Sequence, residues 1–167
     1  MRTIKTDILI LGSGGAGLFA ALHAKKQNPG LDVTIAVKGL LGKCGCTRMV
    51  QGGYNVALAV GDSIERHFMD TIEGGKWLPD QDLAWTLVNV AIERIHELEN
   101  ELGCFFDRNP DGTIHQKAFA GQTFDRTVHK GDLTGIVGVR AAGRPRDVDA
   151  LGVLVEGDDD DRLAGGA

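Results

Sequence analysis

The chain has 167 residues, 43% of them hydrophobic, and a formal net charge of −5. A chain of this length and apolar content is sufficient for one ordinary globular domain, so disorder is not the default expectation. The acidic balance argues against nucleic acid or an anionic membrane surface as the main partner.

The numbers of glycine and cysteine residues further limit the class of protein and its compartment. The 24 glycines are about twice the usual share of roughly 7%, which indicates backbone held close to a ligand, or a stretch that folds poorly. Three cysteines form no even disulfide framework, and no apolar stretch reaches the roughly 18 residues of a membrane span. We therefore expect a reducing, cytoplasmic compartment and no membrane span within the sequence.

The first elements expected along the chain form a βαβ unit. Asp7–Leu11 contains a continuous apolar run, typical of a strand buried on both faces of a parallel sheet. A glycine-rich turn follows at once, and helical spacing then continues until Asn28-Pro29-Gly30. Val33–Val37 is predicted to be the second strand, parallel to the first and joined to it by a right-handed crossover.

The glycine turn has the pattern Gly12-x-Gly14-x-x-Gly17 between a strand and a helix. Gly12 permits the tight turn, Gly14 admits a pyrophosphate close to the backbone, and Gly17 lets helix and strand pack closely. Free N–H groups and the positive end of the helix dipole would hold the anion. A glycine-rich turn without a ligand is the alternative. No acid follows the second strand to bind an NAD ribose, so this unit alone leaves FAD and NAD open.

Residues 39–61 predict no regular element, whereas two helices and a hairpin are expected after them. Asp62 and Glu65 resemble a capping box for a helix to about Glu73, and Asp80 is the expected N-cap of a longer helix. The turn at 109–112 predicts a β-hairpin between 105–108 and 113–116. The apolar face of the longer helix is expected at Leu83, Leu87, Ala91, Ile95, Leu98 and Leu102.

The composition changes after Ile136. Residues 136–167 contain no Ser, Thr, Lys, Asn, Gln or aromatic residue. Gly138, Gly143 and Pro145 disfavour an amphipathic helix there, although 151–156 could form a strand. These residues are built largely from amino acids with GC-rich codons, which suggests a truncated or out-of-frame tail.

Four motifs beyond the first unit point to one family. They are Cys46-Thr47-x-x-x-Gln51-Gly52-Gly53, Trp77-Leu78-x-Asp80-Gln81-Asp82, Phe119-x-Gly121-Gln122-Thr123, and Arg126-Thr127 followed by Asp132-x-Thr134-Gly135. In this order they resemble the succinate dehydrogenase and fumarate reductase flavoprotein family, over about residues 5–135. L-aspartate oxidase, a close relative, shares several of them and often has a histidine where His129 stands.

The resemblance implies an α/β fold: a Rossmann-like FAD-binding domain with a parallel βαβ core, incomplete, with a helix pair and a β-hairpin insertion. In this family a Ser-Lys pair commonly ends the second strand, so the missing acid is expected. Phe119 and Gly121 are candidates for a surviving piece of a dicarboxylate pocket wall, with loop packing as the alternative. The implied FAD-binding residues are Gly12, Ser13, Gly14, Gly15, Ala16, Gly17, Val37, Lys38, Cys46, Thr47, Gln51, Gly52 and Gly53.

Cys46 stands where the family has the histidine that binds flavin covalently. A thiolate is nucleophilic enough to attack the flavin methyl group, but we favour a small loop residue beside noncovalent FAD. Cys44-x-Cys46 does not complete a set of four zinc ligands, so no metal site is expected. His23, His67, His96 and His115 have no partner at catalytic spacing in the sequence.

By resemblance, the intact protein transfers a hydride between a C4 dicarboxylate and FAD, and its electron partner is an iron–sulfur subunit. The expected location is cytoplasmic, or peripheral at the inner face of a membrane through partner subunits. The alternatives are an L-aspartate oxidase-type flavoenzyme and an inactive truncated or frame-shifted product. The family's catalytic arginine and substrate clamps would lie beyond residue 167, so no catalytic residue is assigned. We divide the chain into 1–135, the N-terminal part of an FAD-binding domain, and 136–167, an atypical tail.

Overall fold

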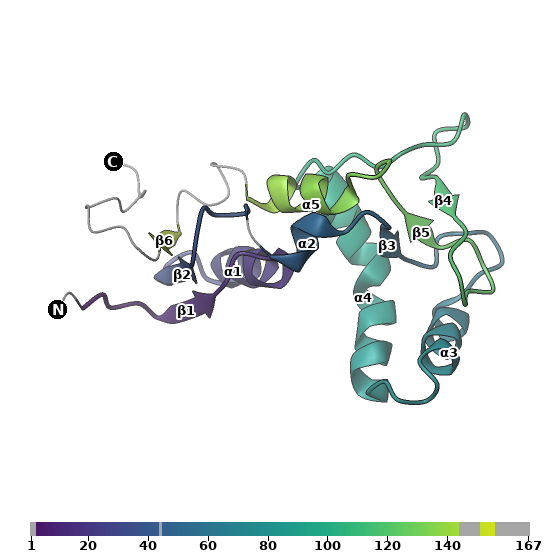
Figure 1. Ribbon diagram of the computed structural model, residues 1–167, viewed down its shortest axis with the longest axis horizontal. Coiled ribbons are helices and arrows are strands. Elements are labelled where there is room, and N and C mark those ends of the chain that lie inside the picture. Colours follow the sequence, from purple (N-terminus) through teal and green to yellow (C-terminus); the bar gives the residue numbers. More distant parts are fainter. Residues whose placement is uncertain (1–2, 44, 144–150, 156–167) are drawn as a thin grey trace. The chain divides into compact units, whose positions relative to one another are not determined.

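The computed structural model describes residues 3–43, 45–143 and 151–155, which fall into two compact units (Figure 1). The first unit is drawn from Met1–Val50 and Gly135–Ala167, and the second is Gln51–Thr134. Cys44 and Pro145 lie outside the described residues, as does most of the acidic end of the tail. Among the described residues, no helix is long and apolar enough to cross a membrane.

The first unit is a parallel three-stranded sheet with helices, in the order β1-β2-β6. The β1 and β2 strands pair in parallel from Ile8↔Val33 to Leu11↔Ala36, and α1 connects them, which confirms the predicted βαβ core. Leu18 and Ala21 of α1 and Ile35 of β2 are fully buried and form its centre. The elements of this unit are β1 (Ile8–Leu11), α1 (Gly15–Gln27), β2 (Val33–Val37), α2 (Cys46–Met49), α5 (Thr134–Ala142) and β6 (Gly152–Val155).

The burial predicted for the first strand is wrong. Leu9 and Leu11 are 55% and 80% exposed, whereas a strand covered on both faces would bury them. The side chains of β1 alternate between a half-buried and an exposed face, so among the described residues only one face of the strand is covered.

The tail contains a helix that the sequence did not predict. Thr134–Ala142 forms α5 despite Gly138 in its interior. Val139, Ala141 and Ala142 are at most 3% exposed, so tertiary packing outweighs the roughly 1 kcal/mol that an interior glycine costs a helix. The strand expected at 151–156 is confirmed as β6, which pairs in parallel with β2.

The second unit combines a helix pair with a small antiparallel sheet in the order β3-β5-β4 (Figure 1). Asp80 is the N-cap of α4, as predicted, and its Oδ1 accepts a hydrogen bond from Leu83 N at 2.9 Å. The cap of α3 is Ser63 rather than Asp62, because Arg126 engages the Asp62 carboxylate. The elements are β3 (Tyr54–Asn55), α3 (Ile64–Gly74), α4 (Gln81–Asn100), β4 (Gln116–Lys117) and β5 (Thr127–Val128).

The face of α4 that is buried differs from the predicted one in its first half. Ile95 and Leu98 are buried as expected, but Leu83 and Leu87 are 70% and 58% exposed. Ala84 and Val88 are buried in their place. In this first half, the buried face is therefore displaced by about one residue from the predicted one. Trp85 packs edge-on against Phe68 of α3.

The predicted hairpin has its turn but not its strands. Gly112 takes the left-handed conformation (φ +85°), and Asn109 N donates to Thr113 O at 2.9 Å. A single antiparallel bridge, Arg108↔Ile114, joins the two arms. Farther along, β4 pairs with β5 instead of with residues 105–108.

Candidate functional site

The glycine turn connects β1 to α1, and its backbone conformation and close contacts require glycine at two positions. Gly12 has φ +103°, which favours glycine, and its amide donates to Ala36 O of β2 at 2.8 Å. A Cβ on Gly17 would lie 2.2 Å from the Gly12 carbonyl oxygen. Any larger residue at position 17 would therefore push the helix off the turn.

Thr47 reaches the start of α1 from 32 residues away along the chain. Gly15 N donates to its Oγ1 at 3.1 Å, and a Cβ on Gly15 would lie 3.0 Å from its Cγ2. The N-cap of the helix is Gly14, which supplies no capping side chain, and the first turn carries no acid. The structure therefore brings together two of the predicted cofactor segments, the glycine turn and the 46–47 loop.

Ser13, Ala16, Val37 and Lys38 complete the set around the turn. Ser13 is buried, and its Oγ accepts a hydrogen bond from Gly42 N at 3.1 Å. Ala16 is exposed in the first turn of α1. Val37 is the buried last residue of β2, and Lys38 follows it exposed, at the carboxyl edge of the sheet where β1 also ends.

Cys46 opens α2 directly after Gly45, whose φ is +98°. Its thiol is free and exposed. Among the described residues, no group of three or more His, Cys, Asp or Glu side chains could hold a metal ion.

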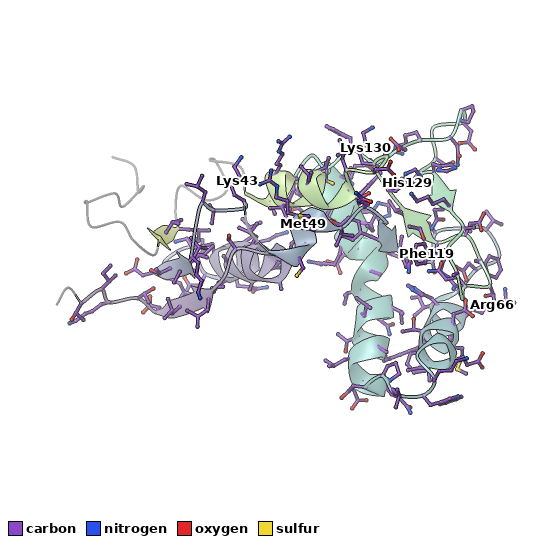
Figure 2. The ribbon with its side chains drawn as sticks, viewed as in Figure 1. Lys43, Met49, Arg66, Phe119, His129 and Lys130 are labelled. Carbon is purple, nitrogen blue, oxygen red and sulfur yellow. The ribbon has the colours of Figure 1, made fainter. Side chains whose placement is uncertain are left out.

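The remaining predicted residues lie in the second unit. Gly53 has φ +137°, and a Cβ there would lie 2.3 Å from Val128 O, so this glycine is needed for contact with β5. A Cβ on Gly52 would be 4.0 Å from the Phe119 ring. Gln51 and Gly121 are exposed, and Phe119 is 57% exposed (Figure 2).

A histidine pair in the second unit was missed by the sequence analysis, which gave His115 no partner. His115 Nδ1 lies 2.7 Å from His129 Nε2. His129 Nδ1 lies 3.3 Å from Asp107 Oδ2, an ion-pair distance without hydrogen-bond geometry. The signal for half of it was present: the predicted turn folds His115 back so that its amide donates to Asp107 O. The part contributed by His129 depends on a long-range contact.

The Asp107 carboxylate of this cluster holds two further donors. Lys130 Nζ lies 2.8 Å from its Oδ1, and Gly131 N donates to its Oδ2 at 2.7 Å (Figure 2). Burial lowers the pKa of His129, Lys117 lowers it further, and Asp107 opposes them. The hydrogen bonds from Lys130 and Gly131 hold the pKa of Asp107 below its ordinary value.

The residues of the glycine turn fit a dinucleotide. The turn offers a cradle that a side chain would fill, backbone N–H groups at a helix start, and no carboxylate to repel a pyrophosphate. The sequence profile described as FAD binding domain matches residues 7–142. The chain belongs to the FAD binding domain family.

Two relatives of this FAD binding domain are similar to it over most of its length. An uncharacterized FAD-dependent oxidoreductase of Methanocaldococcus jannaschii is 47% identical over 132 residues, which is 79% of this chain and 24% of the relative. A chain of the fumarate reductase (CoM/CoB) of Methanothermobacter marburgensis is 46% identical over 132 residues, 77% of this chain and 24% of that protein. The chain thus spans about a quarter of the length of the curated relatives it matches.

A solved structure gives the same result. The E. coli quinol fumarate reductase aligns with a TM-score of 0.81 and 34% identity, over 85% of this chain and 24% of that one. The resemblance to succinate dehydrogenase and fumarate reductase flavoproteins is therefore confirmed for this FAD-binding domain, as is the α/β fold class.

Proposed function

We propose that the glycine turn of this FAD-binding domain holds the pyrophosphate of FAD in a fumarate reductase- or succinate dehydrogenase-type flavoprotein. The observation that carries this is the turn itself, with Gly17 closed on Gly12 and an N-cap residue, Gly14, that supplies no capping side chain to α1. Thr47 would fix the approach of the 46–53 loop through its bond to Gly15. FAD supplies the hydride-accepting ring when bound.

The other candidate residues have supporting roles in this proposal. Lys38, exposed at the carboxyl end of β2, would face the ribose or phosphate side of the cofactor, where an acid would favour NAD. Cys46 would lie beside noncovalently bound FAD. Gln51, Gly52 and Gly53 would line the flavin, and Phe119 with Gly121 would form part of a dicarboxylate pocket wall.

For the intact protein, we propose hydride transfer between a C4 dicarboxylate and FAD. The matched Methanothermobacter relative is named as one of the subunits of a fumarate reductase, which supports assembly with further chains. An iron–sulfur subunit is the electron partner that we propose, and attachment to a membrane would be through partner chains at its inner face.

The test is FAD binding by the whole chain, measured as quenching of flavin fluorescence. The variant is Gly14→Asp. Gly14 has φ −73°, and a Cβ there meets its nearest atom at an ordinary 3.6 Å, so aspartate fits. Aspartate also favours the N-cap position, so the helix should persist. Its charge opposes the pyrophosphate, and we expect FAD affinity to fall about tenfold or more.

Ala20→Asp is the matched control, because it adds the same charge on an exposed position of α1 away from the turn. It should bind FAD as the unaltered chain does. Equal binding by Gly14→Asp and the control would contradict the assignment of the turn. Acid precipitation of the FAD complex should leave the flavin in the supernatant, and flavin retained on Cys46 would show covalent attachment.

A further inference from the structure

A cavity of the first unit is lined by residues other than those of the glycine turn. It has a volume of about 200 Å³ and lies among the 41–43 turn, α2 and α5. Its walls include the apolar side chains of Ile136 and Val139. Three basic residues, Lys43, Arg48 and Arg140, line it, and none of its lining residues is acidic.

Among the described residues, the three cations of this cavity have few polar partners. Arg48 Nη1 donates to the Lys43 carbonyl oxygen at 3.1 Å, which uses one of its five N–H groups. In the part of the chain that the structure describes, no carboxylate forms an ion pair with any of the three side chains. Lys43 and Arg140 are exposed, so water and salt screen the repulsion among the three positive charges, and an anion between them would replace the remaining repulsion by attraction.

The chemistry of the donors and the size of the cavity limit the ligand. Arginine side chains present a planar fork that matches phosphate and carboxylate oxygens, and Lys43 adds a point charge. The volume lies below the roughly 300–1,000 Å³ of sites for drug-sized ligands. A small dianion therefore fits better than a dinucleotide.

We propose that Lys43, Arg48 and Arg140 form a binding site for a small dianionic oxyanion, such as a phosphate group or a short dicarboxylate. Figure 2 shows Lys43 beside α5, the helix that carries Arg140. The site is connected to the glycine turn by one hydrogen bond: Gly42 lines the cavity, and its amide donates to Ser13 Oγ at 3.1 Å. The proposal does not depend on FAD occupying that turn.

The experiment is calorimetric titration of the whole chain with inorganic phosphate and, separately, with succinate, at ionic strength held constant with NaCl. We expect saturable binding of at least one dianion, and the two titrations distinguish phosphate from dicarboxylate as the preferred ligand. Arg140→Ala and Lys43→Ala should each weaken it about tenfold or more, and Arg140→Lys less, because it keeps the charge but loses the fork.

Lys5→Ala is the matched control: it removes one exposed positive charge of the same unit outside the cavity. It should change the affinity less than twofold. Absence of saturable binding by the unaltered chain would overturn the proposal, as would equal weakening by Lys5→Ala and Arg140→Ala. Far-ultraviolet circular dichroism unchanged from that of the unaltered chain shows that the variants are folded, and FAD binding is scored separately from the dianion.

Discussion

Arg126 is a fully buried guanidinium held by two carboxylates. Its Nε and Nη2 donate to the two Asp62 oxygens at 2.6 and 2.7 Å, and Nη1 bonds to Asp70. Asp70 also accepts from the amide and hydroxyl of Thr123. Burial alone would raise the pKa of Asp62, but the hydrogen bonds from Arg126 and Ser63 hold it below its ordinary value. The cluster thus joins α3 and the segment just before it to the loop before β5.

Removing the guanidinium should be strongly destabilising. Arg126→Ala leaves the buried Asp62 carboxylate without its partner, and we expect the free energy of unfolding to fall by about 3–5 kcal/mol. Urea denaturation at pH 7 measures the change. Asp125→Ala, at the exposed neighbouring position, is the control and should lie within about 0.5 kcal/mol of the unaltered chain. Equal stability of the two variants would show that the buried cluster contributes nothing.

The assignment of Arg126 illustrates what a family motif does and does not reveal. In the sequence, the Arg126-Thr127 motif indicates only a resemblance to the family and predicts no role for the Arg126 side chain. The structure shows a role in holding the fold, through acids 56 and 64 residues away along the chain. Contacts at that separation have no signature in local spacing.

At the scale of elements, local rules predicted what short-range chemistry determines. The glycine turn, β2 and the Asp80 cap each depend on a few adjacent residues, and the structure has them as predicted. The α5 helix and the exposed face of β1 depend on what packs against them. Gly138 disfavours a helix when local propensity alone is considered, but the burial of Val139 and Ala142 outweighs that preference.

The cluster of Asp107, His115 and His129 should make the free energy of unfolding depend on pH. Burial lowers the pKa of His129 and also that of His67, so the folded chain binds fewer protons than the unfolded chain below about pH 6.5. The free energy of unfolding therefore rises with pH through this range and is lost as the pH falls.

We expect urea denaturation to show lower stability at pH 5.5 than at pH 8, with part of the difference removed by His129→Gln. Part should remain, because His67 contributes in the same direction. His96→Gln, on an exposed position of α4, should keep the full difference. Stability that increases toward pH 5.5 would contradict the direction of both shifts.

At the scale of the whole molecule, some of the exposed apolar side chains among the described residues lie in short rows on one face of an element. Leu9 and Leu11 share one face of β1, and Leu83 and Leu87 are spaced by one turn of α4. Single exposed apolar residues are ordinary, but rows on one face are typical of surfaces that contact further protein. The matched relatives are longer than this chain, since the 132 matched residues are 24% of each of them.

Residues 1–167 alone should show no succinate or aspartate oxidation, even in excess FAD. Stabilising the charge of a transition state needs preorganised donors in a site closed to water, and loss of one such donor typically costs about 10²–10³ in rate. The chain spans about a quarter of the length of the matched relatives, and we expect FAD bound to it to keep its full immobilisation cost with fewer contacts than a longer protein offers. Dye-linked succinate oxidation by the purified chain is the measurement, with free flavin as the blank. Turnover above that blank, lost in Gly14→Asp and kept in Ala20→Asp, would place a complete catalytic site within these residues.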